Sequence, residues 1–243
     1  MYSFNSRVRY SELNHQNGSL DCSSIINYFQ DCSTFQSEDL NRGLSYLQSK
    51  NRVWLLNYWH LQLLSPAKLG DHITLGTWAY DFKGIYGYRN FIMKKDNEEV
   101  LAVANSIWVY VDSETGKPTR IPKDYAISSG YGMDAPYPME QTQRKVELPE
   151  QHTMYPSFPV RKSNIDSYNH VNNGQYIKLA EEYLPEQFMV TSMRVEYKAQ
   201  AVLGDMIIPM VTNTDNLITI ALANMEHKPY AIIEFQGKSL ESS

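Results

Sequence analysis

Apolar and polar positions in the first half of the chain predict one helix followed by several strands. Ile25, Phe29 and Cys32 recur at the spacing of one helical face. Asp21 stands just before them and is a residue type that caps helix N-termini. From residue 57 to 63 the pattern alternates with the period of a half-buried strand. Further strand patterns follow, at 73–80, 88–94 and 100–111.

The same order of elements starts again in the second half. A short strand pattern at 158–161 precedes a helix pattern over 176–183, which ends before Pro185. Strand patterns then follow at 189–198, 206–211, 217–224 and 230–235. Between them, residues 128–155 are rich in Gly and Pro and lack periodicity, which predicts a linker. We therefore expect an α+β protein with domains at 1–127 and 156–243.

Two short matches indicate that the halves are copies of one another. Val8-Arg9-x-Ser11 resembles Val160-Arg161-x-Ser163 at an offset of 152 positions. Leu69-Gly70-Asp71 repeats as Leu203-Gly204-Asp205 at an offset of 134 positions. The first offset pairs His170 with Gly18 and Asp166 with Asn14, so we expect only the second copy to carry an Asp and a His there.

Composition and charge exclude several classes of protein. The 243 residues carry 22 basic and 27 acidic side chains, and the net charge of −5 argues against nucleic-acid binding. No apolar run is long enough for a membrane span, and the first residues have no apolar signal core. Cys22 and Cys32 form no Cys-x-x-Cys pair, which favours free thiols in the cytoplasm over a redox or zinc site. We expect no metal and no cofactor.

Candidate chemistry gathers between residues 164 and 176. Asp166 and His170 stand just before the second predicted helix, whose first amides are unsatisfied and carry partial positive charge. An imidazole there can act as a general base, and a carboxylate can fix its tautomer. Residues of these types are also common in ordinary turns and caps, so the cluster alone leaves a purely structural role open.

The segment Asp166-x-x-x-His170-Val171-Asn172-Asn173-x-x-Tyr176 resembles the signature of acyl-acyl carrier protein (ACP) thioesterases of the double hotdog type. Other passages that fit the family, in chain order, are Tyr10-Ser11-Glu12, Asn27-Tyr28-Phe29-Gln30-Asp31, Pro66-x-x-Leu69-Gly70-Asp71, Thr77-Trp78, Trp108, Asp112-x-x-Thr115-Gly116-Lys117-Pro118-x-Arg120-Ile121-Pro122 and Val195-Glu196-Tyr197-Lys198. The resemblance implies two tandem hotdog domains, each a long helix wrapped by an antiparallel sheet. It also implies hydrolysis of fatty acyl-ACP, with the catalytic Asp and His at Asp166 and His170.

The chain departs from the plant members of that family at three positions. Tyr168 replaces an Asn, although Asn169 is adjacent, Gln200 replaces a Glu, and Ala201 replaces a frequent Cys. These departures exclude a Cys nucleophile at that place and favour direct attack by water. In this hypothesis His170 activates the water with help from Asp166, and Gln200 aligns water or substrate. The amides near Val171, Asn172 and Asn173 hold the oxyanion.

Binding residues and partners are predicted with less specificity. Ile25, Phe29 and Trp78 are candidates for an apolar acyl slot, although such residues most often form plain core. Three basic groups are candidates to meet an acidic acyl carrier protein despite the net negative charge: Arg161-Lys162, Lys94-Lys95 and Lys117-x-x-Arg120. Any one of them is more often simply part of a solvated charged face. An acyl-CoA thioesterase and a non-catalytic acyl-binding module are the alternatives, and a homodimer stays open.

Overall fold

The computed structural model describes residues 1–15, 17–140 and 142–239. Contacts divide the chain into unit 1, Met1–Asn57 with Leu64–Gln141, and unit 2, Tyr58–Leu63 with Thr142–Ser243. The division falls inside the predicted linker. Residue 141 of that linker and residues 240–243 of the predicted second domain lie outside the described residues. That residues 58–63 belong to unit 2 was not predicted. The linker limits of 128 and 155 stay a prediction.

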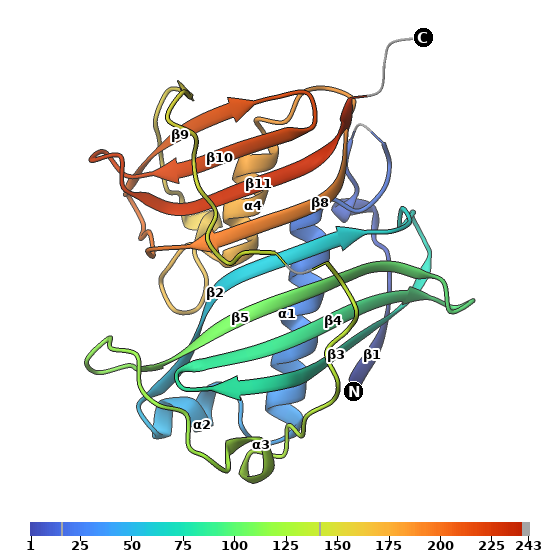
Figure 1. Ribbon diagram of the computed structural model, residues 1–243, viewed down its shortest axis with the longest axis vertical. Helices are drawn as coiled ribbons and strands as arrows, with labels where there is room; N and C mark the ends of the chain where they lie inside the picture. The colour runs from blue at the N-terminus through green and yellow to red at the C-terminus, as the bar shows by residue number, and fades with distance from the viewer. Residues whose placement is uncertain (16, 141, 240–243) are drawn as a thin grey trace. The chain divides into compact units, whose positions relative to one another are not determined.

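Unit 1 is an antiparallel sheet with one long helix, α1 (Cys22–Asp39), packed against it. Its strand order is β1-β3-β4-β5-β2, and in Figure 1 α1 lies behind the strands of its own unit. The strands are β1 (Tyr2–Arg7), β2 (Arg52–Leu63), β3 (His72–Lys83), β4 (Tyr86–Lys95) and β5 (Val100–Asp112). Three short helical segments accompany them, η1 (Tyr10–Glu12), α2 (Leu44–Ser49) and α3 (Tyr125–Ser128).

Helix α1 forms as its sequence predicts. The Asp21 carboxylate accepts a hydrogen bond from the Ser24 amide at 2.6 Å, which caps the first turn. Ile25, Phe29 and Cys32 are all buried, and the Phe29 ring lies 5.3 Å from the Phe91 ring of β4. The predicted face of the helix is therefore the face that packs on the sheet.

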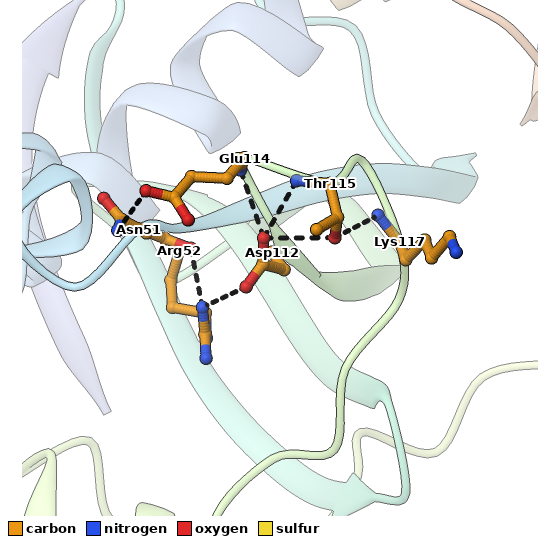
Figure 2. Close-up of polar contacts among 6 residues, drawn as sticks. All are labelled: Asn51, Arg52, Asp112, Glu114, Thr115 and Lys117. Atoms are coloured by element: carbon orange, nitrogen blue, oxygen red, sulfur yellow. Dashed lines mark hydrogen bonds and ion pairs between the residues drawn. The ribbon is translucent and has the colours of Figure 1, made fainter.

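A turn follows β5, and its polar contacts explain why the chain reverses there (Figure 2). The Asp112 carboxylate accepts hydrogen bonds from the amides of Glu114 and Thr115 at 3.1 and 3.0 Å. It also pairs with the Arg52 guanidinium of β2 at 2.7 Å. Because one side chain holds both the turn and the neighbouring strand, the end of β5 is fixed on β2 within unit 1.

Unit 2 repeats the plan with a shorter helix, α4 (Asn173–Glu181), packed on an antiparallel sheet (Figure 1). Residues 58–62 of β2 pair with β8, and the order continues through β11, β10, β9 and β6. The strands are β6 (Thr153–Met154), β7 (Phe158–Pro159), β8 (Phe188–Tyr197), β9 (Met206–Asn213), β10 (Leu217–Ala223) and β11 (Pro229–Ser239), and β7 pairs with β9. A 3-10 turn, η2 (Lys162–Asn164), follows β7.

The predicted linker contributes to both units. In unit 1 the Trp78 indole donates to the Ala135 carbonyl at 2.9 Å, and Tyr137 packs beside it. Thr77, the residue before Trp78, binds the Arg89 guanidinium that also reaches Gln36 of α1. Successive side chains of a strand point to opposite faces, so Trp78 faces away from α1. Trp78 therefore lies on the opposite face of this sheet from Ile25 and Phe29, and its assignment to the acyl slot stays a prediction.

In unit 2 the other part of the predicted linker is held by strand side chains that face one side of the sheet. The Glu196 carboxylate of β8 accepts from the Val146 amide at 3.0 Å. The Arg194 guanidinium donates to the Gln143 carbonyl at 3.1 Å. A Pro-rich segment without periodicity is thus ordered by contacts that no local pattern reveals.

The predicted repeat is confirmed by matching backbone hydrogen bonds in the two units. In unit 1 the Val8 amide donates to the Asp71 carbonyl at 3.0 Å, and the Gly70 amide donates to the Val8 carbonyl at 3.1 Å. In unit 2 the equivalent bonds join Val160 to Asp205 at 2.8 Å and Gly204 to Val160 at 3.2 Å. Gly70 and Gly204 both have positive φ, which suits the tight turn that each occupies. None of the described helices is both long and apolar enough to cross a membrane.

Candidate active site

The loop from Asp166 to His170 is closed by its own backbone. The Asp166 amide donates to the His170 carbonyl at 2.8 Å, and the Asn169 amide donates to the Asp166 carbonyl at 3.1 Å. Asn169 adopts the left-handed conformation with φ of 62°, which Asn tolerates better than most residues. The loop is therefore a compact turn that delivers His170 immediately before α4.

The Asp166 carboxylate binds backbone amides of this loop and does not bind the His170 imidazole. Its Oδ1 accepts from the Tyr168 amide at 2.8 Å and more weakly from the His170 amide at 3.4 Å. The His170 Nδ1 atom is buried and has no hydrogen-bond partner among the residues that the structure describes. The expectation that Asp166 fixes the tautomer of His170 is therefore not what this geometry shows.

The start of α4 also differs from the expectation of free amides. The Val171 amide donates to the Ala201 carbonyl at 2.9 Å, and the Asn172 amide donates to the Asn164 carbonyl at 2.9 Å. Asn172 is the helix N-cap, and its side chain accepts from the Gly174 amide. In this conformation neither amide is available to an oxyanion, which corrects the sequence-based assignment for Val171 and Asn172.

Two buried tyrosines, to which the sequence analysis assigned no role, hold the loop that carries Gln200. The Ala201 amide donates to the Tyr176 hydroxyl of α4 at 2.8 Å, and the Tyr197 hydroxyl of β8 donates to the Asn173 carbonyl at 2.9 Å. Burial raises the pKa of both hydroxyls above the ordinary value for tyrosine, so both stay protonated. Both tyrosines stand in the family-like motifs, and that position is the signal by which the sequence could have identified them.

Gln200 is brought next to the loop of Asp166 and His170 through its neighbour Ala201. Ala201 binds both Val171 and Tyr176, so residue 200 lies at the end of a segment fixed to the start of α4. The Gln200 side chain itself is exposed, as are Tyr168 and Asn169. Their assigned roles, and that of Asn173, stay proposals. No cluster of His, Cys, Asp or Glu suited to a metal ion occurs within the described residues.

The equivalent loop of unit 1 is held by matching backbone hydrogen bonds. The Asn14 amide donates to the Ser19 carbonyl at 2.7 Å, as Asp166 does to His170, and the Leu20 amide donates to the Ala67 carbonyl at 3.0 Å, as Val171 does to Ala201. His170 therefore corresponds to Ser19 and not to Gly18, because the loop of unit 2 is one residue shorter. The conclusion that unit 1 lacks both the Asp and the His at these positions is unchanged.

Replacing Asp166 separates its role as an acceptor from its charge. Asp166→Asn keeps an oxygen for the two amides, so we expect most of the activity to remain. Asp166→Ala removes the acceptor, and displacement of His170 should then lower kcat by up to about 10²-fold. The measurement is kcat for both variants, with hydrogen exchange at the amides of residues 168 and 170. Equal losses in the two variants would instead assign the effect to the negative charge.

Comparison with known families covers both units. Residues 1–128 match the acyl-ACP thioesterase N-terminal domain and residues 147–236 match the C-terminal domain. Oleoyl-acyl carrier protein thioesterase 1 of Arabidopsis thaliana, a chloroplastic protein, is 24% identical over 179 residues, which are 68% of this chain. The chloroplastic palmitoyl-acyl carrier protein thioesterase of Gossypium hirsutum is 24% identical over 193 residues, or 73% of this chain. The chain spans about half the length of these curated relatives, 49% and 46% respectively.

Solved structures agree over nearly the whole chain. An acyl-ACP thioesterase from Bacteroides thetaiotaomicron has a TM-score of 0.87 at 19% identity, with 97% of each chain covered. The 12:0-ACP thioesterase from Umbellularia californica has a TM-score of 0.85 at 14% identity, with 99% of this chain and 98% of that chain covered. These likenesses confirm the predicted double hotdog fold. With both of its domains matched, the chain belongs to the acyl-ACP thioesterase family.

Proposed function

We propose that this protein hydrolyses the thioester of fatty acyl-ACP and releases a free fatty acid. Family membership over both domains supports the substrate class. The proposal depends on one observation: the His170 Nδ1 atom is buried and has no hydrogen-bond partner among the described residues. It lies in a loop that is closed by its own backbone hydrogen bonds. A buried polar atom of this kind retains hydrogen-bonding capacity for a water molecule or a substrate.

The proposed reaction is a single displacement. Water attacks the thioester carbonyl carbon while the His170 imidazole accepts its proton, and the carbon–sulfur bond then breaks. The proton passes from His170 to the leaving thiolate of the carrier, and the acyl group leaves as the acid. Asp166 keeps the loop in place through the amides of Tyr168 and His170.

In this proposal, side-chain amides stabilise the oxyanion. The amides of Val171 and Asn172 are already engaged. The carboxamides of Gln200 and Asn169 are exposed and can each donate a hydrogen bond, because an amide NH₂ has two donors. We assign Gln200 to the alignment of water or of the thioester carbonyl and Asn169 to a secondary role.

A covalent acyl-cysteine intermediate has no candidate nucleophile. Ala201 stands where many relatives of the plant type have a Cys, and the only two cysteines, Cys22 and Cys32, are buried in α1. Burial raises the pKa of the Cys32 thiol to about 12, so it stays a thiol at neutral pH. Direct attack by water is therefore the mechanism that these residues support.

A substrate profile tests the proposal. The protein is assayed with acyl-ACPs of graded chain length and with the matching acyl-CoAs, and we expect the higher kcat/KM on the carrier-bound substrates. A higher kcat/KM on acyl-CoA would favour the alternative of an acyl-CoA thioesterase. Tight binding of acyl ligands without hydrolysis would favour the non-catalytic module.

The variant Gln200→Glu tests whether a carboxylate at residue 200, as in the plant relatives, would increase the activity of this chain. A carboxylate can accept a proton and an amide cannot, so kcat should rise. We expect a gain of up to about tenfold, below the roughly 10²–10⁴ of a complete general base, because His170 already supplies one. Gln200→Ala is the matched control and should lower kcat. An unchanged or lower rate in Gln200→Glu would contradict the role of residue 200 beside the water.

A further inference from the structure

We propose that Arg161, Lys162, Val202 and Leu203 form a docking surface for an acidic face of the acyl carrier protein. This inference rests on the proposed function and adds the place where its protein substrate binds. We call these four residues the docking surface. All four are exposed, and all belong to unit 2, which carries His170.

Backbone hydrogen bonds bring the two halves of the docking surface together. Val160, which precedes Arg161, accepts from the Gly204 amide at 3.2 Å and donates to the Asp205 carbonyl at 2.8 Å. Arg161 and Lys162 therefore begin their turn beside the loop that carries Val202 and Leu203. These contacts link η2 to the turn before β9 across about forty residues of sequence.

The docking surface is also joined to the catalytic loop. Ala201 directly precedes Val202, and its carbonyl accepts from the amide of Val171, the residue after His170. On the other side, the Asn164 carbonyl at the end of η2 accepts from the Asn172 amide. Both halves of the surface are thus bound to the segment that carries His170, so a partner seated there lies next to the candidate site.

The two basic side chains are not neutralised within unit 2. Neither Arg161 nor Lys162 forms an ion pair with a described residue. The acidic residues of the adjoining loops use their oxygens elsewhere. Asp205 Oδ2 accepts from the Val202 amide and from the Tyr230 hydroxyl, and Asp166 Oδ1 accepts from the amides of its own loop.

Unit 1 provides an internal comparison at the same positions of the repeat. There the Arg9 guanidinium is paired with Glu12, with Nε donating to Oε1 at 2.8 Å. In unit 2 the position of Glu12 is occupied by the neutral Asn164, and Lys162 replaces Tyr10. The capping bond itself is kept, because the Arg161 amide donates to Asn164 Oδ1 at 2.9 Å. The local structure is therefore conserved between the units while the ion pair is not, so the unpaired charge is not needed for the turn.

In the loop half of the surface, an apolar residue replaces a cation of unit 1. Val202 stands where unit 1 has the exposed Lys68, and it is 42% exposed, while Leu203 is 53% exposed. Two neighbouring apolar side chains next to two unpaired cations match a partner that offers acidic residues around an apolar contact. The net charge of −5 would repel an acidic carrier, so productive encounter needs a local positive site such as this one.

Charge reversal of Arg161 and Lys162 tests the docking surface. The double variant Arg161→Glu/Lys162→Glu is assayed on acyl-ACP, on the matching acyl-CoA and on a small acyl-N-acetylcysteamine thioester. We expect KM for acyl-ACP to rise by about tenfold or more with little change in kcat, and its dependence on ionic strength to weaken. Turnover of the two small thioesters should stay at the wild-type level.

Two further variants serve as controls. Lys83→Glu/Lys238→Glu makes the same change in net charge at exposed positions outside the surface, and it should leave KM for acyl-ACP unchanged. Arg161→Gln/Lys162→Gln removes the two charges without reversing them and should give an intermediate rise. Thermal unfolding of each variant checks that the fold is intact.

The outcomes separate this inference from the proposed function. If the wild-type protein does not hydrolyse acyl-ACP, the proposed function itself fails. If it does, an unchanged KM in the charge-reversal variant overturns the docking surface. Equal rises for acyl-ACP and acyl-CoA also overturn it, because they would show that the cations bind a phosphate common to both substrates. An equal rise in the Lys83→Glu/Lys238→Glu control would assign the effect to net charge alone.

Discussion

Replacement of His170 by alanine should lower kcat on fatty acyl-ACP by about 10²- to 10⁴-fold, the range typical of a lost general base. The physical reason is that Nδ1 of this imidazole is buried without a described partner in the loop between Asp166 and α4. The assay is single-turnover hydrolysis of an acyl-ACP, which reports the chemical step without product release.

The variant should fold normally, which makes the loss of activity interpretable. The His170 backbone amide and carbonyl bind Asp166, and both remain in His170→Ala. Thermal unfolding should therefore change little. Near wild-type turnover in the folded variant would remove His170 from the mechanism and leave the family's catalytic residues unidentified in this chain.

Phe29→Ala should cause a large loss of stability, lowering the free energy of unfolding by about 3–5 kcal/mol. The Phe29 side chain is fully buried on α1 and lies against Phe91 of β4. Truncation leaves a cavity between the helix and the sheet of unit 1, and the melting temperature should fall by about 6–20 °C. Urea unfolding measures the free energy directly, and a loss below about 1 kcal/mol would show that the site collapses to fill the space.

The same position tests whether the apolar slot includes Phe29. Phe29→Leu keeps most of the apolar volume and should be more stable than Phe29→Ala. If Phe29 lines the slot, the activity profile of the leucine variant over acyl chain length should move toward longer chains. An unchanged profile would mean that Phe29 is core alone.

Periodic segments were predicted well because their signal is local. The face of α1 that carries Ile25, Phe29 and Cys32 is buried as expected, and the Asp21 cap is present. Strand β5 was expected at 100–111 and extends over Val100–Asp112. Helix α1 stops at Asp39, and the short helix α2 follows at Leu44–Ser49.

Segments without a strong period were missed or misread. Strand β1 has exposed and half-buried residues in alternation but few strongly apolar ones, and it owes its place to pairing with β3. Residues 58–63 are the end of β2, yet they belong to unit 2, where residues 58–62 pair with β8. Strand pairing joins residues distant in the chain, so no window of sequence contains it.

Local pattern and motif thus sufficed for the two long helices and most of the strands, for the duplication and for the family. The position of the candidate catalytic loop before α4 could also be predicted, because a turn and an N-cap are specified by adjacent residues. Folding decided which groups are free to act. Ala201 takes the Val171 amide, Asn164 takes the Asn172 amide, and Asp166 binds backbone in place of the imidazole. Such competition for donors and acceptors depends on distances across the fold, and a sequence of side chains does not contain them.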